Sequence, residues 1–305
     1  MVSDAYAIEE LMNLFEVGVE AFAICEIERT AALRCEPLDQ VVVHFVLKGS
    51  GVIEHDGGKC LLQPNAVIVV PRRISKVISG DGPIETICDS SQHCPLGDQP
   101  IRFKAGSGDP DLILGCAAVS GSIGGVIDVF EHLWEPIVED AAGPFLAPVF
   151  GMIERELMNP GIGTRAVVEA LMKQVLIGVF RAQLAGEAYR LWLWPAMMNP
   201  QLGSAALAMM SRPQDHHTIE SLAATAGMSR SRFTEHFTNG FGRSPIEFLQ
   251  AVRLKIAQRL LISSSLPVKS VAAAVGYSSR SHFSRSFQAR FGCDPTAFRK
   301  RKKAT

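Results

Sequence analysis

A pattern near the C-terminal end of this 305-residue chain occurs twice, fifty positions apart. Six residues of the first copy have identical counterparts in the second: Phe233, Phe237, Phe241, Gly242, Pro245 and Phe248 recur as Phe283, Phe287, Phe291, Gly292, Pro295 and Phe298. Repetition at a fixed spacing indicates two copies of one supersecondary unit. Phenylalanines at i and i+4 are typical of the buried side of a helix. The C-terminal third is therefore predicted to contain two similar helical units.

Each copy carries the signals for two short helices joined by a tight turn. In the first copy, Thr218 can cap a helix that ends near residue 226, and Gly227 can take the left-handed conformation of the turn. Ser229 is placed to begin the second helix. The second copy repeats this layout around Gly276. Such a pair predicts a helix-turn-helix, whose second helix enters the major groove of DNA.

The charge distribution supports binding to nucleic acid independently of the repeat. Residues 212–305 hold 16 Lys and Arg against 5 Asp and Glu, a formal charge of +11. Residues 1–211 hold the remaining 14 basic and 26 acidic residues, a formal −12. A basic block supplies phosphate contacts and releases counterions from DNA. The alternative is a solvated basic surface that binds nothing.

The polar residues opposite the phenylalanines are the candidate DNA contacts. They are Arg230, Ser231, Arg232, Thr234 and Glu235 in the first copy, and Arg280, Ser281, Ser284 and Arg285 in the second. Arginine suits the bidentate contact to guanine, and serine or threonine can contact several bases. Glu235 either accepts from a cytosine amino group or pairs with Arg232 or His236; both alternatives stay open.

Residues 200–299 resemble the DNA-binding domain of the AraC/XylS family of transcriptional regulators. The matching phrases are Thr218–Phe237, Phe248–Ala257, Leu266-Pro267-Val268, Val275–Ser278, Phe283–Phe287 and Phe291–Arg299. The resemblance implies double-stranded promoter DNA as the partner, and RNA polymerase as a second partner if the protein is an activator. It places base contacts at Ser231, Thr234 and Glu235, and at Arg280, Ser281, Ser284 and Arg285. Because the first set is small or acidic, we expect the second helix-turn-helix to carry most of the base specificity.

Residues 20–135 have the pattern of a β domain. Val41–Leu47 and Val52–His55 are predicted strands, and Leu61–Pro71 is predicted to contain another pair; the glycine-rich turns between them indicate a barrel or jelly roll. The phrases Leu-x-Gly-x-Gly at residues 47–51 and Leu-x-Pro-x-x-Val-x-Val-Val-Pro at residues 62–71 resemble the cupin sensor domain attached to many AraC-type regulators. We therefore expect an α+β multidomain protein with a cupin-like β-barrel at residues 1–143.

The region after the β domain is helical in pattern. Phe145, Val149, Met152, Ile153 and Leu157 fit one side of a first helix, and apolar residues between 167 and 179 fit a second. The resemblance implies a dimer contact here, so residues 144–190 are predicted to couple the protomers of a homodimer. Packing on the barrel within one chain is the alternative. Residues 191–205 are predicted to be a linker, followed by an all-α DNA-binding domain at residues 206–305.

Cations that follow a predicted strand suggest what the front domain senses. Arg72, Arg73 and Lys76, joined by Arg102, can bind a phosphate or carboxylate, which favours an anionic effector. Arg72-x-x-x-Lys76 resembles the Arg-x-x-x-Arg of PilZ domains, so cyclic di-GMP is one candidate. The alternative is a set of solvated surface cations.

Two other hypotheses about the function of the front domain stay open. Cys88 and Cys94, with His93 between them, could form a thiol-based redox switch. The chain could also be a cupin enzyme joined to a DNA-binding domain, but cupin enzymes cluster their metal ligands, whereas His44 and His55 are isolated. No catalytic residues, metal or cofactor are therefore predicted.

The sequence favours a cytoplasmic location for the chain. No run of about 18 apolar residues indicates a membrane span, and the N-terminus lacks the pattern of an export signal. The seven cysteines have no disulfide-framework spacing. We expect a cytoplasmic, effector-responsive transcriptional regulator that is not an enzyme.

Overall fold

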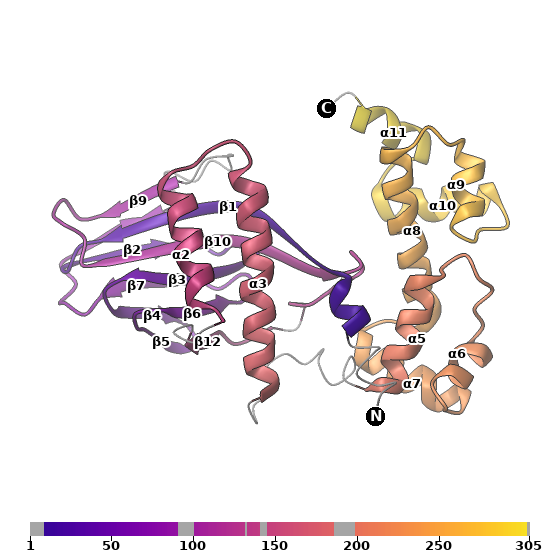
Figure 1. Cartoon of the computed structure of the whole chain (residues 1–305), viewed down its shortest axis with the longest axis horizontal. Coiled ribbons are helices and arrows are strands. Elements are labelled where there is room, and N and C mark those ends of the chain that lie inside the picture. Colours follow the sequence, from indigo (N-terminus) through magenta and orange to yellow (C-terminus); the bar gives the residue numbers. More distant parts are fainter. Residues whose placement is uncertain (1–8, 91–100, 132, 141–144, 186–198, 304–305) are drawn as a thin grey trace. The chain divides into compact units, whose positions relative to one another are not determined.

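The computed structural model describes residues 9–90, 101–131, 133–140, 145–185 and 199–303, which form two compact units (Figure 1). The β-unit comprises Glu16–Gly121 and Val129–Trp192. The helical unit comprises Leu193–Thr305 together with Met1–Phe15 and Ser122–Asp128. The chain therefore passes between the units more than once.

The β-unit contains two sheets. The seven-stranded sheet has the order β12 (Ile137–Asp140), β6 (Ala66–Val70), β3 (Val41–Lys48), β10 (Leu112–Ile123), β1 (Phe15–Ile27) and β9 (Ile101–Ala105), with β11 (Ile127–Asp128) paired to β10. The five-stranded sheet has the order β5 (Gly58–Leu62), β4 (Gly51–His55), β7 (Lys76–Gly80), β2 (Ala31–Cys35) and β8 (Thr86–Asp89). The predicted cupin-like β-rich domain is confirmed, but the described strands form two separate sheets and not a closed barrel.

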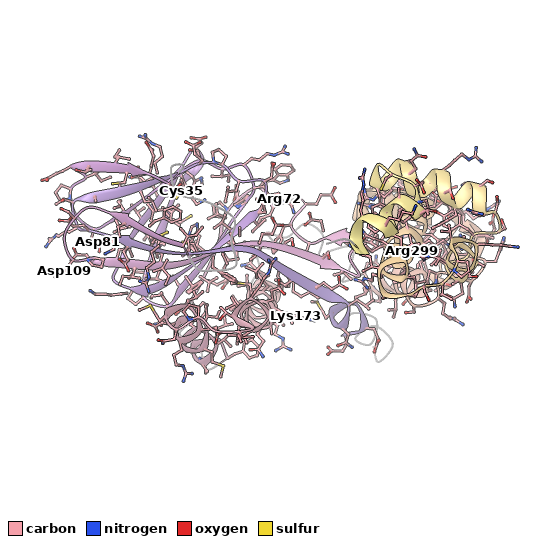
Figure 2. The ribbon with its side chains drawn as sticks, turned by 90° about the horizontal axis from the view of Figure 1, so that it is seen from above. Cys35, Arg72, Asp81, Asp109, Lys173 and Arg299 are labelled. Carbon is pink, nitrogen blue, oxygen red and sulfur yellow. The ribbon has the colours of Figure 1, made fainter. Side chains whose placement is uncertain are left out.

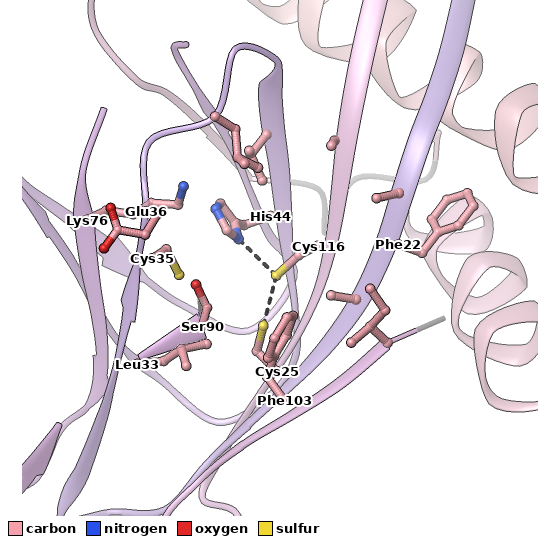
Figure 3. A pocket seen from close by; sticks show the side chains of 16 residues that line it. Phe22, Cys25, Leu33, Cys35, Glu36, His44, Lys76, Ser90, Phe103 and Cys116 are labelled. Carbon is pink, nitrogen blue, oxygen red and sulfur yellow. Dashed lines mark hydrogen bonds between the residues drawn. The ribbon is translucent and has the colours of Figure 1, made fainter. Parts of the chain in front are cut away.

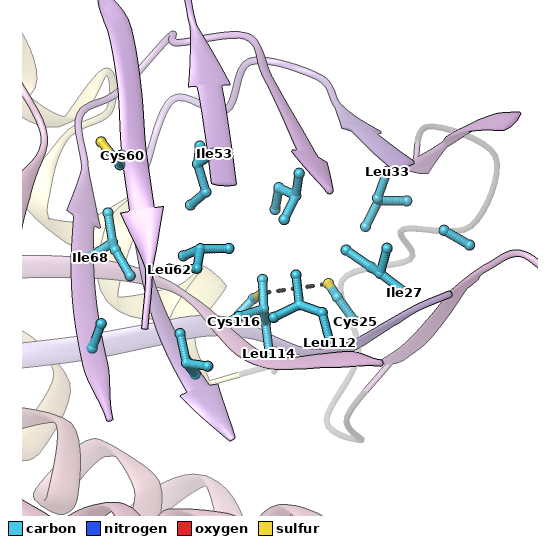
Figure 4. Close-up of a cluster of buried hydrophobic side chains, with 14 of the residues drawn as sticks. Cys25, Ile27, Leu33, Ile53, Cys60, Leu62, Ile68, Leu112, Leu114 and Cys116 are labelled. Carbon is cyan, nitrogen blue, oxygen red and sulfur yellow. Dashed lines mark hydrogen bonds between the residues drawn. The ribbon is translucent and has the colours of Figure 1, made fainter. Parts of the chain in front are cut away.

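The apolar core of the β-unit lies between the two sheets (Figure 4). Ile27, Leu112 and Leu114 of the seven-stranded sheet and Ile53 and Ile78 of the five-stranded sheet are each 0% exposed. Successive side chains of a strand point to opposite faces, so alternate residues of each sheet meet in this layer. Full burial of one such side chain contributes about 1.5–3 kcal/mol to stability.

Two helices, α2 (Ala147–Met158) and α3 (Thr164–Ala185), run along one side of the strands (Figure 2). The ring of Phe150 in α2 packs on Phe45 of β3, with the ring centroids 5.6 Å apart. Gly115 lies directly opposite Phe45 in the register of β3 and β10. A Cβ at this glycine would lie 2.0 Å from the Phe45 ring, so no larger residue fits without a shift. The seven-stranded sheet is thus covered by helices on its outer face.

The buried side of α2 is narrower than the sequence predicted. Val149, Ile153 and Leu157 are buried as expected. Phe145 and Met152 are each 48% exposed. Phe145 precedes α2, and its ring lies under the guanidinium of Arg181 at 5.3 Å. The periodicity includes residues at the edge of an apolar stripe, and only the packed sheet decides which of them are covered.

The helical unit follows the predicted repeat. Its helices are α5 (Pro200–Ser211), α6 (Ile219–Thr225), α7 (Arg230–Phe241), α8 (Pro245–Ser263), α9 (Val268–Ala274), α10 (Arg280–Phe291) and α11 (Pro295–Lys303). The two predicted helix pairs are α6 with α7 and α9 with α10, and α8 connects them. No helix in the described part of the chain has the length and apolar character needed to cross a membrane.

The repeated phenylalanines pack in nearly the same way in both copies. Phe237 and Phe248 meet edge to face with ring centroids 5.3 Å apart and an interplanar angle of 82°. Their counterparts Phe287 and Phe298 are 5.4 Å apart at 76°. Edge-to-face aromatic pairs are favourable beyond the area that they bury. The sequence repeat is therefore a repeat of core geometry.

The helical unit begins inside the segment 191–205 that the sequence indicates as a linker. Residues 186–198 lie outside the described residues, but α5 starts at Pro200. The Oδ1 atom of Asn199 accepts hydrogen bonds from the backbone N–H groups of Gln201 and Leu202, at 3.0 and 3.2 Å. Proline at the first helical position loses no hydrogen bond and favours a helix start. Asn199-Pro200 is therefore a helix-initiation signal.

Candidate nucleic-acid interface and ligand cavity

The turns that present α7 and α10 have the predicted local structure. Thr218 caps α6: its hydroxyl accepts from the N–H of Ser221 at 3.1 Å, and the hydroxyl of Ser221 accepts from the N–H of Thr218 at 3.0 Å. Gly227 and Gly276 have φ angles of +61° and +86°. These left-handed conformations cost glycine nothing and disfavour other residues. Both helix-turn-helix units thus have their second helix fixed by short-range interactions.

A partly buried arginine holds the loop that precedes each helix-turn-helix. Arg253 donates from Nε to the carbonyl of Pro213 at 2.7 Å and from Nη2 to that of Asp215 at 3.0 Å. Arg299, labelled in Figure 2, donates from Nε to the carbonyl of Leu261 at 3.2 Å and from Nη2 to that of Leu266 at 2.6 Å. These two guanidinium groups have a structural role.

The residues predicted to contact DNA lie in the first turns of α7 and α10. Arg230, Ser231, Arg232, Glu235, Arg280, Ser281 and Arg285 are exposed, and Thr234 and Ser284 are half-buried. On the opposite side of the two helices, Phe233, Phe237, Phe283 and Phe287 are each 0% exposed. Each second helix therefore presents a polar face to solvent, as docking in a major groove requires.

The two polar faces differ in how their arginines are engaged. Arg230 donates from Nη1 to the carboxylate of Glu220 at 2.7 Å, and this hydrogen bond lowers the pKa of Glu220. Within the described residues, Arg280 and Arg285 form no side-chain hydrogen bond or ion pair. Glu235 likewise pairs with neither Arg232 nor His236 there. The second helix-turn-helix thus offers two unengaged arginines, which supports the prediction that it carries more base specificity.

A cavity of about 230 Å³ lies between the two sheets of the β-unit (Figure 3). Its lining residues are Ala21, Phe22, Ala23, Cys25, Leu33, Cys35, Glu36, Leu38, Val42, His44, Lys76, Ser90, Ile101, Phe103, Cys116 and Ala118. Cys25, His44 and Cys116 come from the seven-stranded sheet, and Cys35 and Lys76 from the five-stranded sheet. A concave, mostly apolar site with a few polar groups is the usual form of a small-molecule pocket.

Lys76 is the cation in the wall of this cavity. Its side chain starts from β7 directly opposite Cys35 of β2, and the residue is only 3% exposed. The ammonium group has no hydrogen-bond or ion-pair partner among the residues that the structure describes. A buried charge without a partner is costly, because little water remains to solvate it. Lys76 is therefore the group that suits an anionic ligand in this wall, which also contains the exposed Glu36.

Three side chains of the seven-stranded sheet form a hydrogen-bonded row at the cavity wall. Nδ1 of His44 lies 3.0 Å from Sγ of Cys116, which lies 3.4 Å from Sγ of Cys25 (Figure 3). Burial lowers the pKa of His44 well below its ordinary value, and the charge of Lys76 adds to this effect. The hydrogen bond to Cys116, together with burial, raises the pKa of the Cys25 thiol. Nε2 of His44 is buried without a hydrogen-bond partner in the described chain.

One of the four cations proposed from the sequence reaches the cavity. Lys76 lines it, whereas Arg72, Arg73 and Arg102 are not among the lining residues. Nε of Arg73 pairs with Asp39 at 2.9 Å, and Nη1 of Arg102 pairs with Glu26 at 2.7 Å. Arg72, labelled in Figure 2, is half-buried and makes polar interactions of its own. The structure therefore does not bring the four cations together in the cavity.

The structure also places the cysteines. Cys88 on β8 is half-buried against the core, and Cys94 lies outside the described residues. Sequence reasoning missed the contact of Cys25 with Cys116 and treated His44 as isolated. Cys25 and Cys116 are 91 positions apart along the chain, and His44 and Cys116 are 72 positions apart. No local pattern in the sequence therefore indicates these contacts. In the described ranges, no group of three or more His, Cys, Asp and Glu side chains is suited to a metal ion.

Two protein families match the chain. The cupin family matches residues 7–185, and a helix-turn-helix domain family matches residues 222–301. The first match spans more than half of the chain and covers the β-unit with α2 and α3. The second covers both helix-turn-helix units.

Named relatives are transcriptional regulators. The HTH-type transcriptional regulator MtrA of Neisseria gonorrhoeae is 26% identical over 298 residues, which cover 96% of this chain and 97% of that protein. AlkR of Acinetobacter baylyi is 27% identical over 281 residues, with 86% and 88% covered. The RCS-specific HTH-type transcriptional activator RclR of Escherichia coli is 33% identical over 172 residues, with 52% and 60% covered. Among solved structures, the DNA-binding domain of AdpA in complex with a target DNA is 32% identical, covers 34% of this chain and 94% of that one, and has a TM-score of 0.33.

Proposed function

The chain belongs to the AraC family of DNA-binding transcriptional regulators and carries an N-terminal cupin domain, and we propose that the cavity of this domain binds the effector that controls DNA binding. The observation that carries the proposal is Lys76, a buried cation without a partner in the described chain, in the wall of a mostly apolar cavity. The named relatives are transcriptional regulators, which supports effector binding as the role of the cavity.

The cavity defines the chemistry of the effector. An ammonium group at the wall favours a carboxylate or another single anionic group, through a charge-assisted hydrogen bond. The apolar lining favours an apolar body for the rest of the molecule. This lining supports an effector that is less polar than the cyclic di-GMP considered from the sequence.

Effector binding would control DNA binding by a shift between two arrangements of the chain. A ligand shifts such an equilibrium only when it binds one arrangement more tightly than the other. Strands β1 and β10 both line the cavity, through Cys25 and Cys116. Phe15 is the first residue of β1, and Ser122 lies near the end of β10. At these two residues the chain passes between the β-unit and the helical unit. A change at the cavity therefore has a covalent route into the helical unit.

Replacement of Lys76 by methionine is expected to remove the preference for an anionic effector. The full-length chain would be melted with a series of straight-chain monocarboxylates, their uncharged amides, and cyclic di-GMP. A ligand at a hundredfold its dissociation constant adds about 2.7 kcal/mol of stability. Lys76→Met should weaken binding of the best carboxylate roughly ten- to a hundredfold, which is the effect of one hydrogen bond to a charged group, and should leave binding of the amide nearly unchanged.

Arg73→Met is the matched control, because it removes a cation that pairs with Asp39 at the surface and does not line the cavity. It should bind the carboxylate as the unmodified chain does. A carboxylate that binds the Lys76→Met and unmodified chains equally well would refute the assignment. Loss of binding in the Arg73→Met chain alone would move the site to the cations first considered from the sequence.

The same family supports a homodimer as a prediction for this chain. Met152 and Met158 of α2 and Val167 of α3 are 48%, 50% and 43% exposed, so both helices present large apolar side chains to solvent. We expect sedimentation velocity of the full-length chain at micromolar concentration to show a dimer. Met152→Glu should shift it towards the monomer, whereas a monomeric unmodified chain would contradict the prediction.

A further inference from the structure

We propose that Cys25, Cys116 and His44 form a thiol oxidation site that converts an organic hydroperoxide in the cavity into a Cys25–Cys116 disulfide. The two Sγ atoms are 3.4 Å apart across neighbouring strands, β1 and β10. A disulfide bond is about 2.05 Å long, so formation requires an approach of only about 1.4 Å.

The contacts assign different roles to the two cysteines. Cys116 lies between the other two groups, next to Nδ1 of His44 and Sγ of Cys25. Its pairing with His44 is fixed by the sheet, because these two residues are directly opposite each other in the register of β3 and β10. His44 is held neutral by burial, so its Nδ1 can accept a hydrogen bond from the Cys116 thiol and orient it. Cys116, the thiol that contacts His44, is therefore assigned as the attacking thiol, and Cys25, its sulfur neighbour, as the resolving thiol.

The reaction balances with one hydroperoxide per disulfide. The Cys116 sulfur attacks the terminal oxygen of the hydroperoxide, the O–O bond breaks, and the alcohol leaves with the proton of the Cys116 thiol. Cys116 is then a sulfenic acid. The Cys25 sulfur attacks the Cys116 sulfur, the S–S bond forms, and the hydroxyl group leaves as water with the Cys25 proton. Two electrons pass from the sulfur atoms to the peroxide.

The cavity sets the selectivity of this site. Cys25 and Cys116 are 4% and 8% exposed, so an oxidant reaches them only through the cavity. Phe22, Phe103 and Leu33 contribute apolar lining that favours a hydroperoxide with an apolar body over hydrogen peroxide. The unpartnered Nε2 of His44 is a further polar atom at this place, available to the bound molecule.

The position of the site links it to the helical unit. A bond between β1 and β10 fixes the offset of the two strands that lead out of the β-unit at Phe15 and Ser122. The inference does not depend on an anionic effector, because Lys76 takes no part in the covalent chemistry. It rests on the proposed function only in one respect, the expectation that oxidation changes the affinity for DNA.

The test is oxidation of the reduced full-length chain with cumene hydroperoxide, followed by peptide mapping. We expect a Cys25–Cys116 cross-link that dithiothreitol reverses, formed at a lower concentration than with hydrogen peroxide. The oxidised chain should differ by at least about fivefold from the reduced chain in affinity for a duplex selected from a random library. No cross-link, a cross-link between other cysteines, or unchanged DNA affinity would overturn the proposal.

Single variants separate the two thiols without requiring the disulfide. In Cys25→Ser, dimedone should trap the sulfenic acid at Cys116; in Cys116→Ser it should not label Cys25. Labelling of Cys25 instead would overturn the assigned roles. Cys35→Ser, which changes another thiol of the cavity, is the matched control and should still cross-link. Lys76→Met should cross-link as well, so failure of the anionic-effector proposal and failure of this one remain distinguishable.

Discussion

Replacement of Phe287 by alanine is expected to lower the free energy of unfolding of the helical unit by about 3–5 kcal/mol. Phe287 is 0% exposed and its ring meets those of Phe283, Phe291 and Phe298, with centroids 5.7, 4.5 and 5.4 Å away. Truncation removes buried apolar surface and leaves a cavity that the surrounding helices fill only in part. Chemical denaturation of the full-length chain, followed by fluorescence and circular dichroism, measures the change.

Gln288→Ala is the control on the same helix, because Gln288 is exposed. It should change the stability by no more than about 0.5 kcal/mol. A loss below about 1 kcal/mol for Phe287→Ala would mean that the second copy of the aromatic cluster is not a packed core. The equivalent substitution Phe237→Ala should cost a similar amount, since its rings are arranged almost identically.

Replacement of Arg285 by alanine is expected to weaken specific DNA binding by about 1–3 kcal/mol, which is roughly 5- to 150-fold in the dissociation constant. Arg285 lies on the exposed side of α10, and its guanidinium has no partner in the described chain. A bidentate contact with guanine uses two N–H donors of this guanidinium group. Fluorescence anisotropy with a duplex selected by the full-length chain, and with a random duplex, measures the affinity for each.

Binding to the random duplex distinguishes a base contact from a phosphate contact. Binding to it should change little in Arg285→Ala if the arginine reads a base. An equal loss on both duplexes, with a shallower salt dependence, would instead identify a phosphate contact. Arg290→Ala serves as the control, because Arg290 lies in the last turn of α10, whereas base contacts come from the first turns.

The helical unit was predictable from the sequence because its determinants are local. Thr218, Gly227 and Gly276 act within a few residues, and the phenylalanines at i and i+4 mark the buried side of each helix. The exposed position of Arg280 and Arg285 follows directly, since the side opposite a buried stripe faces solvent. The base that each residue contacts depends on the DNA and stays a prediction.

Local patterns in the sequence do not predict the order of strands in the β-unit. The alternation of apolar residues predicts strands such as Val41–Lys48, but it does not say that β3, β10 and β1 are neighbours. For the same reason the four cations near residues 72–76 and 102 looked like one site, whereas the sheets direct Lys76 inward and leave Arg73 and Arg102 in surface ion pairs.

Helical periodicity, capping and turn residues act over a few positions, so the tandem helix-turn-helix, its polar faces and the β-rich domain in front of it follow from the sequence. The cavity and the row formed by His44, Cys116 and Cys25 follow from the fold of the β-unit. Contacts between side chains 72 and 91 positions apart arise from the pairing of strands, and strand pairing is set by the packing of the whole core.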